Sequence, residues 1–372
     1  MNRVIIYILP LFFTVACSVG LNKEKTIAVS NNYAKGFAVK EFDDFKVVEV
    51  VNPWDSTSLL QRYILIPKEN DIPTDIPSGT IVRTPVNRAA VYASLHCGMM
   101  REIGVDSAIV GVCDVHFIAD KRLKERIKIG EIADMGSSFL PDVEKIISLS
   151  PEVIIVSPYQ DGSYGKVEQL GVPIIEMADY MEDTPLARTE WLKFIAMLFE
   201  CEDVADSIFS ATETEYLRLS EIGRNIKNRP TLFCELKTGG VWYQPGGASY
   251  MAQLYRDAGI NYLWSDNCDK GSISLSFEEV LMRGANADLW FIKYADEKDK
   301  TISSLLQEYA PYSNFKSSNS GNVWGVNGLK VPFYEDMPIY PHLVLRDFMI
   351  IAHPEIFSPS DTTKYYKRLK NE

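Results

Sequence analysis

The chain has 372 residues, of which 46% are hydrophobic and 24% charged, a composition typical of a globular protein long enough for two domains. Its 50 acidic residues outnumber its 38 basic residues, and the resulting net charge of −12 argues against nucleic acid as a partner. The cysteines show no CxxC spacing, so the sequence indicates neither a zinc site nor a redox motif.

The N-terminus reads as an export signal. Met1–Arg3 carries one positive charge, and the apolar run Val4–Val15 is too short to span a bilayer but suits a signal peptide. The following Ala16-Cys17 resembles a lipobox, which implies a signal peptide over residues 1–16, cleavage before Cys17 and a diacylglycerol on its sulfur. An ordinary secretory signal with an incidental cysteine is the alternative. The polar residues 17–35 are then interpreted as a lipidated tether.

Residues 36–184 are predicted to form a first α/β lobe. It begins with a β-rich stretch that contains the strands Phe45–Val51 and Arg62–Ile66. From Thr80 onward short apolar runs alternate with helical patterns, which is typical of βαβ units with parallel strands. The expected strands are Ile81–Thr84, Ile109–Val112, Val153–Ser157 and Pro173–Glu176, and the expected helices are Ala89–Ile103, Asp142–Ser148 and Tyr164–Gln169.

A long helical segment over residues 185–229 separates this lobe from a second one. It has almost no glycine or proline, and its apolar residues recur at helical spacing until Pro230 ends it. The second lobe, residues 230–372, repeats the alternation. Its expected strands are Leu232–Leu236, Leu289–Ile292 and Val323–Val326, and its expected helices are Tyr250–Ala258, Phe277–Met282, Ser303–Tyr309 and Pro341–Ala352.

The two lobes share an internal unit. Pro141–Tyr159 and Leu275–Tyr294 each combine an acidic helix start, an amphipathic helix, a turn, a buried strand and a final tyrosine. One such unit per half favours a bilobed, pseudo-symmetric protein, although helix–turn–strand units also resemble one another by chance.

The order of these segments resembles the bacterial solute-binding proteins for ferric siderophores, haem and vitamin B12. The similarity lies in Thr80–Asp114, in Gly130–Ser157 with its run PDVEKIISLSPEVIIV, in Ser274–Ile292 and in Tyr340–Phe357. The resemblance implies two Rossmann-like α/β lobes with mostly parallel sheets, joined by a long rigid helix, with the ligand in the cleft between them. It also implies a monomeric, lipid-anchored periplasmic protein that passes its ligand to an ABC permease and ATPase and is not an enzyme.

Candidate ligand-binding residues follow from the rule that ligands bind beyond the carboxyl ends of parallel strands. Arg88 offers a planar cation for an anionic chelate, or else forms a surface ion pair. Trp242 and Tyr243, in the glycine-rich stretch KTGGVWYQPGG, offer flat faces for a bulky ligand, unless the tryptophan belongs to the core. The full set, expected to meet across one cleft, is Asn87, Arg88, His116, Ser137, Tyr159, Lys237, Trp242, Tyr243 and Tyr294.

Glu144 and either Glu278 or Glu279 are candidates for docking to the permease. In the family that the chain resembles, one acidic residue of this unit in each lobe pairs with permease arginines, and two distant carboxylates fix the orientation of docking. A second interpretation is that these acidic side chains stabilise the helix dipole, and both can hold together.

The ligand that the sequence favours is a ferric siderophore, because basic residues recur in the predicted loops. Vitamin B12 is the next alternative because of the two aromatic faces, and haem belongs to the same family. Direct zinc or manganese binding is disfavoured, because only His116 of the four histidines falls in a predicted cleft loop. No covalent cofactor or resident metal is expected. A nitrogenase-like two-lobed enzyme and a surface receptor without a small ligand are the alternatives from other classes.

Overall fold

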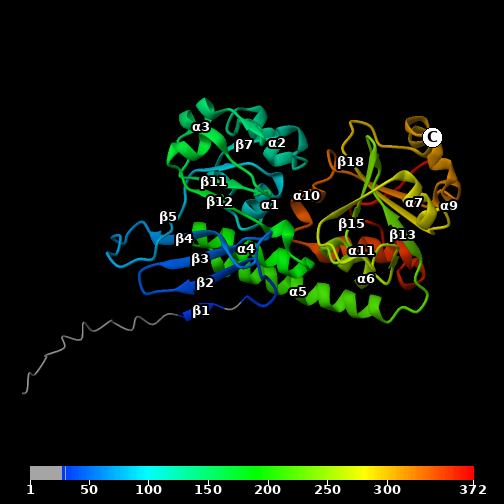
Figure 1. The fold of residues 1–372 in the computed structure, drawn as a ribbon, viewed down its shortest axis with the longest axis horizontal. Coiled ribbons are helices and arrows are strands. Elements are labelled where there is room, and N and C mark those ends of the chain that lie inside the picture. The colour runs from blue at the N-terminus through cyan, green and yellow to red at the C-terminus, as the bar shows by residue number, and fades with distance from the viewer. Residues whose placement is uncertain (1–26, 30) are drawn as a thin grey trace, which may run out of the picture.

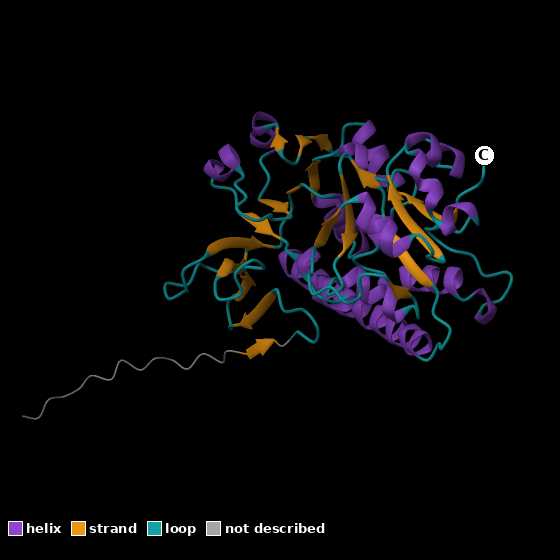
Figure 2. Cartoon of the chain, turned by 45° about the vertical axis from the view of Figure 1, so that its right-hand side comes forward, coloured by secondary structure: helices purple, strands orange, loops and turns teal. Residues whose placement is uncertain are grey.

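The computed structural model describes residues 27–29 and 31–372, so the predicted signal peptide and Cys17 lie outside the described residues. Two α/β lobes lie side by side, and a separate N-terminal sheet packs at one end of the molecule (Figure 1). Figure 2 shows the same arrangement from a second direction, with helices around the strands of the lobes. The mixed α/β fold with mostly parallel sheets in the lobes agrees with the sequence prediction.

The β-rich N-terminal part of the chain forms a five-stranded sheet of its own. Its first four strands are antiparallel neighbours in chain order, and the fifth adds in parallel. One face packs on helix α4, Pro185–Phe199, where the ring of Phe37 lies 5.0 Å from Trp191 and 5.8 Å from Phe194. The strands are β1 Ile27–Val29, β2 Phe37–Glu41, β3 Lys46–Val51, β4 Leu59–Pro67 and β5 Thr80–Thr84.

Two buried glutamates hold the segment between β1 and β2. Backbone N–H groups of residues 32–34 donate to the Glu190 carboxylate at 2.8–2.9 Å, and those of residues 35–36 donate to Glu182. Burial raises the pKa of Glu182, although the hydrogen bonds from the N–H groups of residues 35–36 and from the Trp191 indole lower it. The prediction of a free tether over residues 17–35 is therefore wrong at its C-terminal end, because this part of the chain is bonded to the protein interior.

The first lobe is built on a parallel sheet with the strand order β12-β11-β6-β7-β8. A two-stranded hairpin, β9 and β10, follows the edge strand. The strands are β6 Ala89–Val91, β7 Ile109–Val112, β8 Ala133–Asp134, β9 Gly136–Ser137, β10 Leu140–Pro141, β11 Val153–Val156 and β12 Ile174–Glu176. The helices are α1 Ser94–Glu102, α2 Lys121–Lys128 and α3 Val143–Leu149, while the predicted helix 164–169 is the 3-10 helix Gly165–Leu170.

The start of this lobe differs from the prediction by one strand. The helix expected from Ala89 begins only at Ser94, because Ala89–Val91 is the central strand β6, with all three residues buried. The strand expected at 81–84 exists but belongs to the N-terminal sheet as β5. A short apolar run is compatible with both a buried strand and a helix start, so periodicity alone could not separate them.

Two long helices connect the lobes. Helix α4, Pro185–Phe199, has 14 of its 15 residues buried, so it runs through the interior instead of over the surface. Helix α5, Glu202–Arg224, is ~35 Å long at 1.5 Å per residue and packs on α4 and on α11. Glu200 separates the two helices with a φ of 53°, where the chain turns between them.

The second lobe repeats the architecture with the strand order β16-β13-β18-β19-β20, of which only β20 runs antiparallel to its neighbour. A small antiparallel sheet, β14-β15-β17, lies beside it. The strands are β13 Thr231–Cys234, β14 Lys237–Thr238, β15 Val241–Pro245, β16 Asn261–Tyr262, β17 Ser272–Leu275, β18 Leu289–Tyr294, β19 Val323–Asn327 and β20 Lys367–Arg368. The helices are α6 Tyr250–Asp257, α7 Phe277–Gly284, α8 Ile302–Glu308, α9 Lys316–Asn319, α10 Phe333–Asp336 and α11 Pro341–Ala352.

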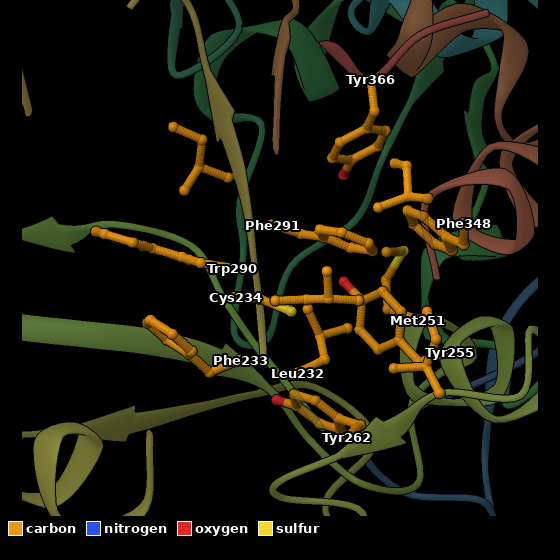
Figure 3. Close-up of a cluster of buried hydrophobic side chains, with 14 of the residues drawn as sticks. Leu232, Phe233, Cys234, Met251, Tyr255, Tyr262, Trp290, Phe291, Phe348 and Tyr366 are labelled. Atoms are coloured by element: carbon orange, nitrogen blue, oxygen red, sulfur yellow. The ribbon is translucent and has the colours of Figure 1, made fainter. Parts of the chain in front are cut away.

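The core of the second lobe is aromatic. Phe291 of β18 stacks on Phe348 of α11 with ring centroids 5.0 Å apart, and Tyr255 of α6 lies 5.1 Å from the same ring (Figure 3). The final segment of the chain completes this cluster with Tyr366, which is fully buried. The sheet and its covering helices are thus fixed by ring packing, which keeps the strand ends that face the first lobe in place.

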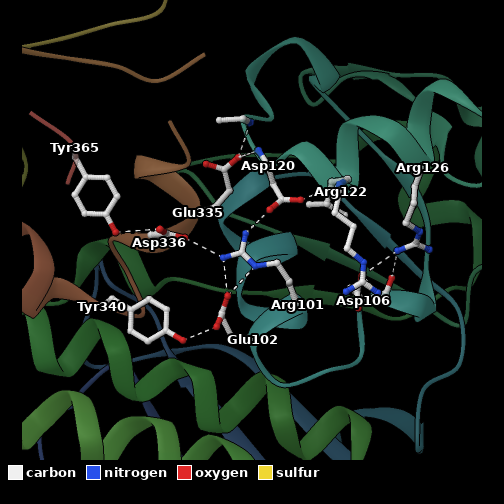
Figure 4. A network of polar contacts seen from close by, with 12 residues as sticks. Arg101, Glu102, Asp106, Asp120, Arg122, Arg126, Glu335, Asp336, Tyr340 and Tyr365 are labelled. Atoms are coloured by element: carbon white, nitrogen blue, oxygen red, sulfur yellow. Dashed lines mark hydrogen bonds and ion pairs between the residues drawn. The ribbon is translucent and has the colours of Figure 1, made fainter. Parts of the chain in front are cut away.

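A polar network provides a second connection between the lobes (Figure 4). Arg101 of α1 contacts Asp120 of its own lobe at 2.8 Å and Asp336 of α10 at 2.9 Å. The buried Glu335 carboxylate accepts the backbone N–H of Ala119 at 2.7 Å, and burial raises its pKa. Together with the α4–α5 connection, this network limits how far the lobes can separate.

Candidate ligand-binding cleft

A cavity of about 900 Å³ lies between the two lobes. The second lobe supplies most of its wall, mainly from the loops after β13 and β18 and from β15. The first lobe contributes Leu95, Tyr180 and Met181, and α4 contributes Arg188. The cavity is therefore an interface between three parts of the fold, as expected for a ligand cleft.

A second cavity of about 460 Å³ adjoins the first one on the side of the N-terminal lobe, and Leu95 and Tyr180 line both. It lies beyond the carboxyl ends of β6, β7 and β11, where ligands of parallel sheets bind. Aromatic rings dominate its wall, accompanied by Ser94, Ser138, Ser157 and Asp114. We call this cavity the aromatic chamber; its six rings are Tyr92, Phe117, Phe139, Tyr159, Tyr164 and Tyr180.

Arg188 forms part of the cavity wall and belongs to a buried charged group. Its Nε lies 2.8 Å from Asp179 Oδ2, and Asp179 Oδ1 lies 3.4 Å from His96 Nε2. Burial alone would raise the pKa of Asp179, but Arg188 and His96 outweigh it and hold this pKa below its usual value. Arg188 also stands over the ring of Tyr250 at 4.8 Å, which fixes its orientation at the cavity.

Two ion pairs of the second lobe line the larger cavity. Lys293, at the end of β18, contacts Glu235, whose backbone has the left-handed φ of 64° after β13. Burial lowers the pKa of Lys293 to about 8, while its contact with Glu235 favours the charged form. Lys300 contacts Asp296 at 3.0 Å and also Glu308.

Three of the sequence-predicted residues line the cleft. Tyr159 lines the aromatic chamber, and Tyr243 and Tyr294 line the larger cavity. Tyr159 and Tyr294 are the final tyrosines of the two repeated units, so the internal symmetry places one on each side of the cleft. The repeat is present in the structure as α3–β11 and α7–β18.

Three further candidates lie next to the cleft without lining either cavity. His116 is exposed and packs edge-on against Phe117, a ring of the aromatic chamber. Ser137 precedes the lining residue Ser138, and its Oγ accepts the backbone N–H of Phe139. Lys237 precedes the lining residue Thr238, and its ammonium contacts the Gly239 carbonyl and the Tyr309 ring.

Asn87 and Arg88 are not at the cleft. They precede β6, so they lie at the amino end of the parallel sheet, the edge opposite to the cleft. The Arg88 guanidinium donates to the carbonyls of Leu149 and Ser150 at the end of α3, and the Asn87 N–H donates to Glu152. The prediction was wrong because it assigned the preceding strand, now β5, to this sheet.

Trp242 is also not at the cleft surface. It is 0% exposed, whereas its neighbour Tyr243 is 47% exposed, because successive side chains of β15 point to opposite faces. The Trp242 indole donates to the Cys234 carbonyl at 2.9 Å and packs among the rings of the core. The core interpretation left open by the sequence is therefore the one that the structure supports.

Sequence reasoning missed Arg188 and the tyrosines of the aromatic chamber other than Tyr159. An arginine inside the largely apolar run PLARTEWLKFIAMLF was a usable signal, since a buried charge requires a partner and often a function. Tyr92 and Tyr180 had no such signal, because an isolated tyrosine reads as core.

The docking candidates differ in what their carboxylates do. Asp142 and Ser276 both act as N-caps, so Glu144 and Glu278 occupy the same position in the two repeated helices. Both are exposed. Glu279 instead closes a capping box, in which its Oε2 accepts the Ser276 N–H at 2.7 Å.

Metal-ligating side chains do not gather in the described part of the chain. Across residues 27–29 and 31–372, no group of three or more His, Cys, Asp or Glu side chains is arranged to hold a metal ion. The cysteines of this part are free, and burial raises the pKa of the Cys234 thiol to about 12. They are Cys97, Cys113, Cys201, Cys234 and Cys268.

Comparisons with known proteins agree with this geometry. A family model described as periplasmic binding protein matches residues 90–325. An uncharacterised lipoprotein of Methanocaldococcus jannaschii is 25% identical over 371 residues, covering 92% of this chain and 86% of that protein.

Two solved structures have a similar fold. A periplasmic haem-binding protein from Pseudomonas aeruginosa aligns with a TM-score of 0.59 at 14% identity, covering 76% of this chain and 97% of that one. An ABC-type Fe³⁺-hydroxamate transport protein from Saccharomonospora viridis aligns with a TM-score of 0.57 at 17% identity, covering 74% and 94% of the two chains.

Proposed function

Because the chain belongs to the periplasmic binding protein family, we propose that it is the substrate-binding component of an ABC importer and that its ligand is a large metal chelate. This family consists of solute-binding proteins, and the similar structures are solute-binding proteins too, so a nitrogenase-like enzyme is set aside. The observation that carries the proposal is the cavity of about 900 Å³ between the lobes together with the adjoining cavity of about 460 Å³ in the first lobe. Their combined size suits a chelate better than a bare ion.

We place a ferric siderophore first among the ligands, with vitamin B12 and haem as alternatives from the same family. The solved structures of similar fold include a haem-binding and an Fe³⁺-hydroxamate transport protein, which supports a chelate without selecting one. The aromatic chamber supports all three, because rings pack on planar or acyl-bearing ligands. Direct zinc or manganese binding is disfavoured by the absence of a ligand set in the described residues.

Ligand titration tests this proposal. Purified protein is mixed with ferric siderophores, cyanocobalamin, haem, Zn²⁺ and Mn²⁺, and intrinsic tryptophan fluorescence is recorded. We expect saturable quenching with at least one chelate and none with the free ions. Saturable binding of Zn²⁺ or Mn²⁺ together with no response to any chelate would contradict the proposal. A fluorescence signal that changes with none of the ligands, as expected of a surface receptor, would contradict it too.

We further propose that the mature protein is anchored through acylated Cys17 at the outer side of the membrane, in the periplasm, as a monomer. The similarity to a protein named as a lipoprotein supports the anchor. Within the described ranges no helix combines the length and apolar character that crossing a bilayer requires. Incorporation of labelled fatty acid, abolished in the Cys17→Ser variant, is the expected result in cells.

Docking to the permease is proposed to use Glu144 and Glu278, while Glu279 serves its own helix. The shared N-cap register supports this choice, because Glu278 has the position of Glu144, and the Glu279 carboxylate is occupied by Ser276. We expect E144Q and E278Q each to weaken binding to the permease complex while leaving stability and ligand affinity unchanged.

E279Q is the matched control. It should leave permease binding unchanged and stability close to that of the wild type, because Gln at this position can also close the capping box with Ser276. Binding is measured with the reconstituted transporter, and stability by urea unfolding. Equal loss of binding in E278Q and E279Q would contradict the assignment.

A further inference from the structure

The basic side chains that line the cleft are paired with carboxylates of the protein. Four basic side chains line the larger cavity, and the aromatic chamber has none in its wall. A cleft built for a highly charged anion would present cations that lack a protein partner, since the anion has to replace the water it loses. The partners of Arg188, Lys270, Lys293 and Lys300 therefore decide which chelates the cleft can accept.

Each of these cations has a carboxylate partner. Arg188 contacts Asp179, as described above, and Lys293 contacts Glu235. Lys300 is held between Asp296 and Glu308.

The fourth pair connects the two sides of the cleft. Lys270 lies in the loop before β17 of the second lobe, and its Nζ is 2.5 Å from Oδ1 of Asp183, which lies just before the N-cap of α4. Among the residues that the structure describes, every lysine or arginine in the wall of the two cavities is thus neutralised locally. In the aromatic chamber the charged lining residue is Asp114, which is itself an anion.

We propose that the cleft selects metal chelates of zero or small net charge and rejects strongly anionic ones. This inference rests on the proposed function and narrows its ligand class, within ferric siderophores, to neutral complexes such as ferric trihydroxamates, with the neutral cobalamins as the alternative. A trianionic tricatecholate complex would have to displace a carboxylate from its cation or lie against Asp114 and the rings without compensation. Either process costs binding free energy that a neutral chelate does not lose.

The wall of the aromatic chamber fits the same ligand class. Its hydroxyl groups can exchange hydrogen bonds with carbonyl or hydroxyl oxygens of a neutral chelate, and its rings can cover the organic shell of such a complex. The ion pairs of the larger cavity then provide a polar wall around the ligand, and the ligand itself does not have to be charged.

A charge series tests the inference. Dissociation constants are measured by tryptophan fluorescence for a neutral ferric trihydroxamate, a trianionic ferric tricatecholate and cyanocobalamin, at about 50 and 500 mM salt. We expect a neutral complex to bind at least about tenfold more tightly than the trianion, with a dissociation constant that changes less than about twofold with salt. Tighter binding of the trianion, weakened by salt, would overturn the inference and leave the proposed function intact. No binding of any chelate would overturn both.

A variant in which Lys270 loses its carboxylate partner provides the second measurement. D183N removes the partner of Lys270 and should increase affinity for the tricatecholate complex by about two- to fivefold, in a salt-dependent manner, without changing affinity for the neutral complex. E69Q removes the same charge from an exposed loop remote from the cleft lining and should change neither. If D183N and E69Q behave alike, pairing does not govern selectivity and the inference fails.

Discussion

Arg188 combines a position at the ligand cleft with a place in the interior of the protein. Its guanidinium is held by Asp179, which is fully buried and also contacts His96. Removing one partner of such a pair leaves a charge without compensation in a medium of low polarity. The orientation of the arginine, and thus the shape of the cleft wall, depends on this carboxylate together with the ring of Tyr250.

D179N should therefore lower the free energy of unfolding by about 3–5 kcal/mol, measured by urea denaturation. The same carboxylate gives the wild type a pH dependence. Because the folded-state pKa of Asp179 lies below its usual 3.8, its contribution is fully present above this value and is lost as the pH falls through the lower, folded-state pKa.

D161N, at an exposed loop residue, is the control and should behave like the wild type. A loss below about 1 kcal/mol in D179N would show that Arg188 finds another partner, and the pair would then not define the cleft wall.

At the scale of single residues, the sequence predicted some of the cleft lining and misjudged the rest for identifiable reasons. Tyr159 and Tyr294 were found because the repeated unit ends in them. Trp242 and Tyr243 are adjacent on β15, and alternation decides which one faces the cleft, but sequence gives no independent sign of which face is inward. Arg88 was misplaced because its position depended on the assignment of the preceding strand.

Among the elements, helix α4 has the most unusual environment. Its polar residues Arg188 and Glu190 are buried together with its apolar ones, because the N-terminal sheet covers the side that a connecting helix would expose. The carboxylate of Glu190 accepts three backbone N–H groups from residues 32–34. The N-terminal segment is thus fixed to the same helix that carries the cleft arginine.

E190A should release this segment. We expect faster amide hydrogen exchange at residues 32–34, since each N–H loses a charged acceptor, a bond of about 1.5–3 kcal/mol. The strands β11 and β18 should keep wild-type protection. E221A, at an exposed position of α5, is the control. Unchanged exchange at residues 32–34 in E190A would mean that other contacts hold the segment.

Long periodic elements and the apolar strands β7, β11 and β19 were predicted well, whereas elements without a clear apolar pattern were not. The final helix was predicted with the observed bounds, Pro341–Ala352, because proline marks its start and its apolar spacing is regular. Helix α2, KRLKERIK, was missed because only Leu123 of it is buried, so it has no apolar stripe to recognise. Strand β6 was predicted as part of a helix, because a run of three small and β-branched residues is too short to show a hydrophobic periodicity.

The whole molecule is held in its two-lobed form by separate connections. The helices α4 and α5 form one, and the network around Arg101, Asp336 and Glu335 forms the other (Figure 4). Such double attachment predicts a small change of inter-lobe distance on ligand binding, instead of a wide hinge.

R101M should loosen the second connection. Spin labels at exposed positions 128 and 297, one in each lobe, report the inter-lobe distance after the exposed Cys268 is replaced by serine. We expect a broader distance distribution in R101M than in wild type, because the contact with Asp336 across the lobes is lost. R122M removes an ion pair with Asp106 inside the first lobe and should leave the distribution unchanged. Identical distributions in both variants would contradict a restraining role for Arg101.

The two glutamates that hold residues 32–36 show how much of the chain a stable fold needs. The family match begins at residue 90, yet excision of everything before it would strip Glu182 and Glu190 of their amide donors and uncover the rings of Trp191 and Phe194. Two carboxylates without their hydrogen-bond donors and an apolar face of α4 would then be exposed to water, on the helix that carries Arg188. The N-terminal sheet is therefore needed to cover α4, and a shortened version of this protein would have to retain it.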